Sequence, residues 1–262
     1  MHRCVYCYAI KFPSFRGPII PRFELKNLIL KMIKGTEKRY PVMLSDSTDP
    51  YMHIEAKCEI TKKCVEALAV NGFPLLIVTK SDLVTRDINL FKMTRTVVTM
   101  TVTSPEENVA RLIEPNAPPP NARFRALEKV VEAGLPAVIR IDPIIPTLND
   151  DPKELDAIVR RAAEIGVKQI TGSTLKVVPG LLPSMKMECK RLYDRLIKVY
   201  SDGEWVGGYK YLRVDKRLKI LTDLRNLALK HGLEFATCRE GFPQLNTTVC
   251  DGTAYCRSAP QL

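Results

Sequence analysis

One unit recurs along the chain from Pro21 onward and limits the folds available to it. In each copy an amphipathic helical stretch ends near a glycine and leads into a short strand rich in β-branched residues. The successive pairs are ELKNLILKMIKG and PVMLSD, EAKCEITKKCVEALAVNG and PLLIVTK, SDLVTRDINLFK and RTVVTMTVT, NARFRALEKVVEAG and LPAVIRIDPII, PKELDAIVRRAAEIG and VKQITGSTL. Because strands that are apolar on both faces are typical of parallel sheets, we predict an α/β protein.

The polar residues distinguish the two architectures that such units can build. They cluster after successive strands, at residues 45–49, 79–81, 101–104 and 142–146. Polar residues at the carboxyl ends of successive strands are typical of the catalytic face of a β/α barrel. A doubly wound sheet gathers them at one switch point and usually carries a glycine-rich phosphate loop, and the sequence has neither GxGxxG nor GxxxxGK[ST]. We therefore predict a partial (β/α) barrel.

Two segments interrupt the repeat. Residues 113–124 are rich in proline and are expected to form a loop at the barrel mouth. A long basic helix over about 212–231 is followed by a strand and a cysteine-bearing tail, and a solvated outer helix is the favoured interpretation of its charge. The predicted division is a barrel core over 1–211 and a C-terminal helix, strand and tail over 212–262.

Composition bounds the class of protein. The sequence has no apolar run of the ~18–20 residues that a membrane span needs and no signal-peptide stretch, so a cytoplasmic chain without a membrane partner is expected. Eight cysteines without a secretion signal indicate reduced thiols or metal ligands. The formal charge of +11 suits either a nucleic-acid partner or a solvated Lys/Arg-rich surface.

The chain opens with a cysteine pair, Cys4 and Cys7, spaced C-x2-C with Tyr6 directly before the second. Two thiolates at this spacing bind one metal centre through a tight turn, which suits zinc, an iron–sulfur cluster or a redox dithiol.

The segment HRCVYCYA resembles the back half of the radical SAM signature C-x3-C-x2-C, in particular that of the spore photoproduct lyase-like group. Three later segments are similar to stretches of the same group: SDSTDPYMHIE to TDPYQPxE, VTKSDLVTRD to TKS…RD, and IEPNAPPPNARFRALEKVVEAGLPAVIRIDPIIPTLND to EPxAP…R…AGxxVxVxxxPIIPxxND. They occur in the right order and span most of residues 2–150, whereas the last third of the chain matches only loosely.

This resemblance implies a radical SAM type partial TIM-like barrel with two cofactors. Cys4 and Cys7 would hold a 4Fe–4S cluster together with a third cysteine expected one residue before Met1, the first strand also being absent. S-adenosylmethionine would bind the remaining iron of the cluster. After a ferredoxin or flavodoxin has reduced the cluster, cleavage of S-adenosylmethionine would give a 5′-deoxyadenosyl radical. The substrate of this radical is unknown, and nucleic acid is one possible class. The residues expected to bind the cofactor are Tyr6, Ser47, Thr48, Asp49, Lys80, Thr101 and Arg140.

The chemistry of these positions suits the cofactor. Ser47, Thr48 and Asp49 can meet its ammonium group, and Lys80 or Arg140 its carboxylate or ribose. The alternatives are a turn residue before a proline for Asp49 and a solvated strand end for Lys80.

Several interpretations stay open. Photoproduct lyase carries a hydrogen-donating cysteine after the second strand, whereas Asp46 or a neighbour stands there and no cysteine lies between Cys7 and Cys58. The rival classes are a zinc- or nucleic-acid-binding module and an inactive radical SAM fragment. The three tail cysteines are either ligands of zinc or an auxiliary cluster, unrelated thiols, or the source of a hydrogen atom; they are Cys238, Cys250 and Cys256.

Overall fold

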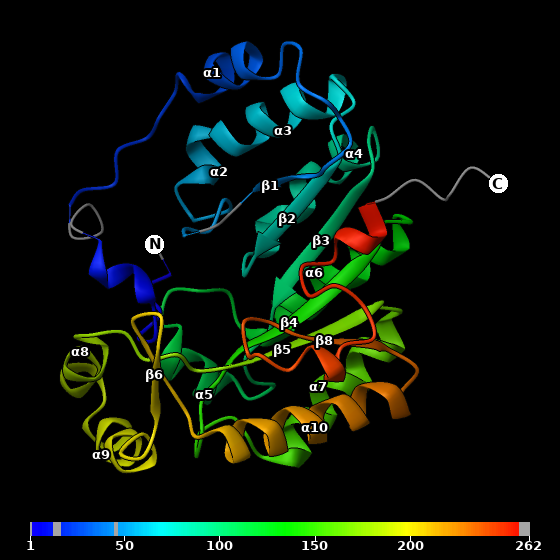
Figure 1. The fold of residues 1–262 in the computed structure, drawn as a ribbon. Helices are drawn as coiled ribbons and strands as arrows, with labels where there is room; N and C mark the ends of the chain where they lie inside the picture. The colour runs from blue at the N-terminus through cyan, green and yellow to red at the C-terminus, as the bar shows by residue number, and fades with distance from the viewer. Residues whose placement is uncertain (1, 13–16, 45–46, 257–262) are drawn as a thin grey trace.

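The computed structural model describes residues 2–12, 17–44 and 47–256, and its core is one parallel sheet (Figure 1). The sheet has six strands in the order β1-β2-β3-β4-β5-β8, each parallel to its neighbour. The strands are β1 (Val42–Leu44), β2 (Leu75–Thr79), β3 (Thr96–Thr101), β4 (Ala137–Ile144), β5 (Gln169–Thr174) and β8 (Glu234–Thr237). The predicted α/β class and partial barrel are confirmed. The predicted polar positions Ser45 and Asp46 lie outside the described residues.

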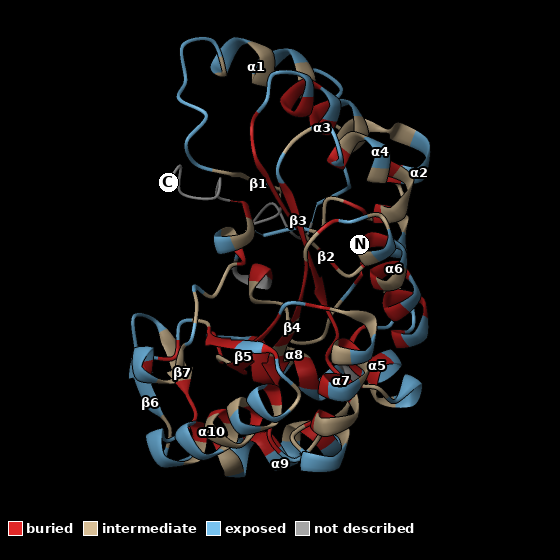
Figure 2. Cartoon of the chain, turned by 90° about the vertical axis from the view of Figure 1, so that its right-hand side faces the viewer, coloured by how far each residue is buried: buried red, intermediate tan, exposed pale blue. Residues whose placement is uncertain are grey.

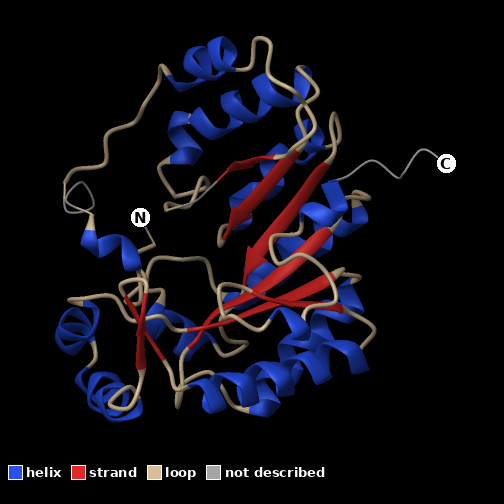
Figure 3. Ribbon diagram, in the orientation of Figure 1, coloured by secondary structure: helices blue, strands red, loops and turns tan. Residues whose placement is uncertain are grey.

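Helices cover the outer face of this sheet (Figure 3). The α-helices are α1 (Leu25–Met32), α2 (Glu55–Cys58), α3 (Ile60–Val70), α4 (Ile88–Phe91), α5 (Glu107–Ile113), α6 (Pro120–Glu132), α7 (Pro152–Ile165), α8 (Leu181–Glu188), α9 (Lys190–Val199) and α10 (Val214–Lys230). Side chains of α3, α6, α7 and α10 form one buried core with alternate residues of the strands. Figure 2 shows the continuous burial of the central strands β3 and β5, whereas no residue of the edge strand β1 is fully buried.

The helix ends follow the chemistry expected from the sequence. Gly35, Gly72, Gly134 and Gly166 adopt positive φ angles of 76°, 74°, 80° and 90° after α1, α3, α6 and α7. At the other end of α7, Asp151 accepts a hydrogen bond of 2.8 Å from the Lys153 amide. Such caps pair backbone groups that the helix itself leaves unbonded.

The helix expected over residues 55–72 is broken in two. Glu59 has a φ of 50°, and α3 begins directly after it. The carboxylate of Glu55 folds back to accept hydrogen bonds from the amides of Thr61 (3.0 Å) and Lys62 (3.2 Å). These bonds satisfy amides at the start of α3, so a side chain sets the break rather than a glycine or proline.

Two further boundaries differ from the prediction. Residues 82–91 form a 3₁₀ turn, η3 (Asp82–Asp87), followed by the short α4 rather than one helix. The proline-rich loop expected over 113–124 ends earlier because α6 starts at Pro120. Proline fits the first helical turn, where its missing N–H costs no hydrogen bond.

The C-terminal segment joins the sheet and covers its inner face. Strand β8 pairs with β5, and the tail then crosses to the turn η5 (Thr253–Cys256), drawn in red beside β3 in Figure 1. Cys256 is buried there against Leu76, Val97 and Val138 of the central strands. The tail therefore closes the interior of the partial barrel below the carboxyl ends of the strands, and the predicted division at residue 212 stays a prediction.

A second apolar cluster lies beside the barrel. It joins α8, α9 and the antiparallel hairpin of β6 (Glu204–Val206) and β7 (Tyr209–Tyr211), and the N-terminal residues Val5, Tyr6 and Tyr8 pack against it. The cysteine-bearing N-terminus is thus anchored on the same side as the strand ends. Among the described residues, no helix is long and apolar enough to cross a membrane.

Candidate functional site

A cavity of about 420 Å³ opens at the carboxyl ends of the strands. Its wall contains every site residue expected from the sequence, namely Cys4, Tyr6, Cys7, Ser47, Thr48, Asp49, Lys80, Thr101 and Arg140. The structure therefore brings together residues that lie up to 136 positions apart in the chain, from Cys4 to Arg140. Their roles in binding stay predictions.

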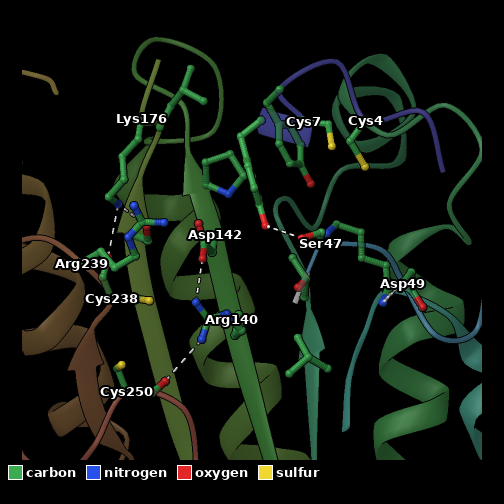
Figure 4. A pocket seen from close by; sticks show the side chains of 18 of the residues that line it. Cys4, Cys7, Ser47, Asp49, Arg140, Asp142, Lys176, Cys238, Arg239 and Cys250 are labelled. Atoms are coloured by element: carbon green, nitrogen blue, oxygen red, sulfur yellow. Dashed lines mark hydrogen bonds and ion pairs between the residues drawn. The ribbon is translucent and has the colours of Figure 1, made fainter. Parts of the chain in front are cut away.

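A tight turn carries the two N-terminal thiols. The Cys7 amide donates to the Cys4 carbonyl at 3.1 Å, and the Val5 amide donates to the Ile113 carbonyl at 2.9 Å. Both sulfur atoms lie on one side of the cavity (Figure 4). Burial raises the pKa of the Cys4 thiol to about 11 in spite of the nearby Lys80 ammonium. A bound cation would be needed to hold this thiol as a thiolate at neutral pH.

A buried ionic network fixes this turn from below. The Tyr6 hydroxyl donates to Oε1 of Glu114, whose Oε2 lies 2.6 Å from an Nη of Arg123. Arg123 also donates to the carbonyls of Thr101 (3.0 Å) and Pro118 (2.8 Å), and its side chain and that of Glu114 are fully buried. The proline-rich segment is thus tied to the end of β3 and to the cysteine turn at once.

The carboxylate of Asp49 has four partners within the chain. Oδ1 accepts from the Tyr51 amide (2.8 Å) and the Thr79 hydroxyl (2.7 Å), while Oδ2 accepts from the Lys80 amide (2.7 Å) and lies 3.0 Å from Nε2 of His2. Burial raises the pKa of Asp49, but the bond and charge of His2 and the bonds from Thr79 and Lys80 outweigh it and hold the pKa below its ordinary value. Only the Tyr51 contact lies within the turn of Asp49, so the carboxylate also ties this turn to the end of β2 and to the N-terminus.

Lys80 points into the cavity from the end of β2. Its Nζ lies 5.8 Å from the centre of the Tyr6 ring. Burial would lower the pKa of this ammonium, but the charges of Cys4, Glu114 and Asp49 raise it above its ordinary value. Lys80 therefore stays a cation beside the cysteine turn, available to an anionic group.

The hydroxyl groups of Ser47 and Thr48 lie at the open rim. Both side chains are exposed, and the Tyr8 hydroxyl donates to Oγ of Ser47 at 3.5 Å. They can contact a ligand without displacing a buried contact.

The opposite wall carries the expected Arg140 together with charged partners that sequence reasoning missed. Arg140 lies 2.7 Å from Oδ2 of Asp142, and Nζ of Lys176 lies 2.7 Å from Oε1 of the buried Glu240 (Figure 4). The sequence could have identified Asp142. It stands two positions after Arg140 in the stretch RIDP of β4, and residues two apart on a strand point to the same face of the sheet. Arg217, which the sequence placed on a solvated helix face, is instead buried and lies 3.2 Å from Oε2 of Glu240.

The three tail cysteines do not form one group. Cys238 and Cys250 line the cavity, whereas the Cys256 thiol is buried under the sheet and donates to the Leu75 carbonyl at 3.2 Å. A zinc or cluster site made of all three is therefore wrong. Across residues 2–12, 17–44 and 47–256, no three His, Cys, Asp or Glu side chains converge as a metal site.

The N-terminal turn fits part of an iron–sulfur site. Its two thiols share one side of the cavity and are the soft donors that such clusters require. They fit two of the three ligand positions of the signature. Next to them, Lys80 and the rim hydroxyls fit a small zwitterionic ligand.

Comparison with known proteins identifies the family of this chain. The model of the radical SAM superfamily matches residues 1–159. The uncharacterized protein ORF301 of Acidianus two-tailed virus is 32% identical over 194 residues, which are 67% of this chain and 64% of the viral protein. The uncharacterized protein Rv2578c of Mycobacterium tuberculosis is 27% identical over 186 residues, 65% of this chain and 54% of that protein. The chain thus spans between 54% and 64% of the length of these relatives.

Solved structures share the fold. A spore photoproduct lyase variant superposes with a TM-score of 0.67 and 18% identity, over 87% of this chain and 69% of that one. Another variant, with bound AdoMet and dinucleoside spore photoproduct, gives a TM-score of 0.66 at 17% identity over the same shares. SuiB of Streptococcus suis bound to S-adenosylmethionine gives 0.58 at 12% identity, over 94% of this chain and 50% of that one. From the family match over more than half of its length, this chain belongs to the radical SAM superfamily.

Proposed function

We propose that this chain is a radical SAM enzyme that binds a 4Fe–4S cluster and S-adenosylmethionine in the cavity at the strand ends. When bound, these groups supply a reductive cleavage that gives a 5′-deoxyadenosyl radical. The single observation that carries the proposal is that the thiols of Cys4 and Cys7 share one cavity with the polar ends of the strands. An electron donor of the ferredoxin or flavodoxin class is required as a partner.

The residues of the chain have separate tasks in this proposal. Cys4 and Cys7 hold two irons of the cluster. Lys80 neutralises the carboxylate of the cofactor, and Ser47 and Thr48 bind its ammonium group at the rim. Glu114 and Arg123 hold the cysteine turn in place and do not touch the cofactor.

The substrate enters the same cavity from its open side. The wall opposite the cysteine turn carries Arg140, Asp142 and Lys176, so the substrate is expected to be polar. One solved structure that shares this fold holds a dinucleoside spore photoproduct, but its sequence is only 17% identical, so nucleic acid is one substrate class to be tested and not a conclusion from the fold.

Cofactor cleavage tests the proposal. Protein carrying a cysteine directly before Met1 is reconstituted with iron and sulfide without oxygen, reduced with dithionite and given S-adenosylmethionine. We expect 5′-deoxyadenosine in chromatography, and none from the Cys7→Ala variant. Zinc in place of iron would favour the zinc-binding module, and iron without 5′-deoxyadenosine would favour an inactive radical SAM fragment.

A further inference from the structure

Two thiols that the proposed function does not use face each other in the cavity wall. Cys238 follows β8, and Cys250 lies in the tail that returns along it (Figure 4). The two side chains lie next to each other, with both sulfur atoms in the same part of the wall (Figure 4). Both side chains are partly accessible, so a small molecule in the cavity can reach them.

The backbone holds the two cysteines in register. The Cys238 amide donates to the Gly172 carbonyl at 3.0 Å, which continues the pairing of β8 with β5. The Cys250 carbonyl accepts from the Thr171 hydroxyl at 3.0 Å. Both cysteines are therefore tied to adjacent residues of the same strand, Thr171 and Gly172, and their approach does not depend on a free loop.

The tail between them is also tied down. The Asn246 side chain accepts from the Thr237 amide at 2.7 Å, and Thr247 exchanges backbone and side-chain bonds with Phe235. These contacts keep the segment that carries Cys250 alongside the end of β8. Because the backbone around both thiols is already ordered, closing them into a disulfide costs little conformational entropy.

The surroundings shift the pKa values of the two thiols in opposite directions. The neighbouring Cys250 thiol and the guanidinium of Arg140 hold the pKa of Cys238 below its ordinary value, although burial and the Asp142 carboxylate act against them. The neighbouring Cys238 sulfur, together with burial, raises the pKa of Cys250. One thiol is thus the better nucleophile and the other is a protonated neighbour, which is the division of roles in a dithiol that exchanges disulfides.

We infer that Cys238 and Cys250 form a redox-active dithiol that reduces small-molecule disulfides in the cavity, with Cys238 as the nucleophile and Cys250 as the resolving thiol. The Cys238 thiolate attacks one sulfur of the disulfide, forms a mixed disulfide and releases one thiolate. Cys250 then loses its proton to that leaving group and attacks the sulfur of Cys238, which forms the Cys238–Cys250 disulfide and releases the second thiolate, and this thiolate takes a proton from water. Two electrons pass from the protein to the small disulfide, which is the oxidant. This reaction needs neither the cluster nor S-adenosylmethionine.

The experiment uses reduced protein without added iron, so its outcome is independent of the proposed function. The protein is mixed with bis(2-hydroxyethyl) disulfide, remaining thiols are blocked with N-ethylmaleimide, and peptides are mapped by mass spectrometry. We expect the Cys238–Cys250 disulfide as the main product, with a mixed disulfide on Cys238 in samples quenched early. Cys238 is expected to react before Cys250, because the Arg140 guanidinium beside it favours the thiolate.

Single substitutions separate the two roles. Cys250→Ser should accumulate the mixed disulfide on Cys238, Cys238→Ser should leave Cys250 blocked by maleimide, and Cys58→Ser should behave as the unchanged protein. If Cys250→Ser does not fold, the early mixed disulfide in the unchanged protein carries the same information. The inference is overturned if Cys238 and Cys250 are both blocked by maleimide while another cysteine holds the mixed disulfide.

Discussion

The hydroxyl of Tyr6 donates a hydrogen bond to the carboxylate of Glu114, 108 residues further along the chain. Tyr6 stands between the two cysteines of the N-terminal turn, and Glu114 is paired with Arg123 in a fully buried site. The orientation of the cysteine turn therefore depends on an ion pair that lies beneath it.

Removal of the Glu114 charge should destabilise the protein strongly. Glu114→Gln leaves the Arg123 guanidinium buried without its counter-charge, and breaking a buried pair in this way typically costs about 3–5 kcal/mol. Urea unfolding gives the change in the free energy of unfolding. The matched control is Glu128→Gln on α6, whose half-exposed carboxylate lies 3.8 Å from Arg161, and a change within about 0.5 kcal/mol is expected there. Equal losses in the two variants would contradict the account of the buried network.

The same ion pair predicts a sensitivity to acid. Burial raises the pKa of Glu114, but Arg123, Lys80 and the hydrogen bond from Tyr6 outweigh it, so the folded-state pKa lies below the ordinary value of 4.5. A lowered folded-state pKa stabilises the fold above the unfolded-state pKa, and this stabilisation is lost as the pH falls through the folded-state pKa. The free energy of unfolding should therefore fall more steeply below about pH 5 in the unchanged protein than in Glu114→Gln. Parallel curves for both proteins would show that Glu114 does not titrate in this way.

Asp49 and His2 provide a test of cofactor recognition. If the cofactor ammonium replaces His2 at Oδ2 of Asp49, Asp49→Ala should weaken S-adenosylmethionine binding about ten- to hundredfold, because a charge-assisted bond contributes roughly 1.5–3 kcal/mol. It should also lower the melting temperature, since the amides of Tyr51 and Lys80 lose their acceptor.

The control for this test is His2→Ala. This change removes the contact that the ammonium would replace, together with the 3.4 Å contact of Nδ1 with the Asn116 carbonyl, and it leaves the Asp49 carboxylate in place. Binding should therefore be kept or strengthened in calorimetric titration of the reconstituted protein. A lower melting temperature with unchanged affinity in Asp49→Ala would mean that Asp49 is a turn residue alone.

Much of the fold could be predicted because it is encoded locally. Glycines such as Gly72 and Gly134 end helices by their own conformation, and apolar strands indicate a parallel sheet wherever they occur. The break at Glu59 could not be predicted, because it depends on the Glu55 carboxylate folding back onto amides of the next turn. Arg217 was misplaced for a similar reason, since its partner Glu240 comes from the tail.

The site was predicted in part. Motifs identified the residues that line the cavity from the N-terminus to β4, because each lies within a recognisable segment. The spacing of the tail cysteines did not indicate that Cys238 and Cys250 are neighbours and that Cys256 is not. The tail crosses the inner face of the sheet, which leaves Cys238 and Cys250 in the cavity wall and brings the Cys256 thiol to the Leu75 carbonyl. His2 was also missed, since a histidine without a neighbouring ligand residue in sequence gives no signal of its contact with Asp49.

The iron content of the reconstituted protein tests the central claim most directly. In protein with a cysteine directly before Met1, we predict about four irons per chain and absorption near 400 nm. Cys4→Ala and Cys7→Ala should each lose most of this iron while keeping their helical circular dichroism, and Cys58→Ala should retain it, since Cys58 lies outside the cavity. Full iron content in Cys4→Ala or Cys7→Ala would contradict the claim that these two thiols bind the cluster.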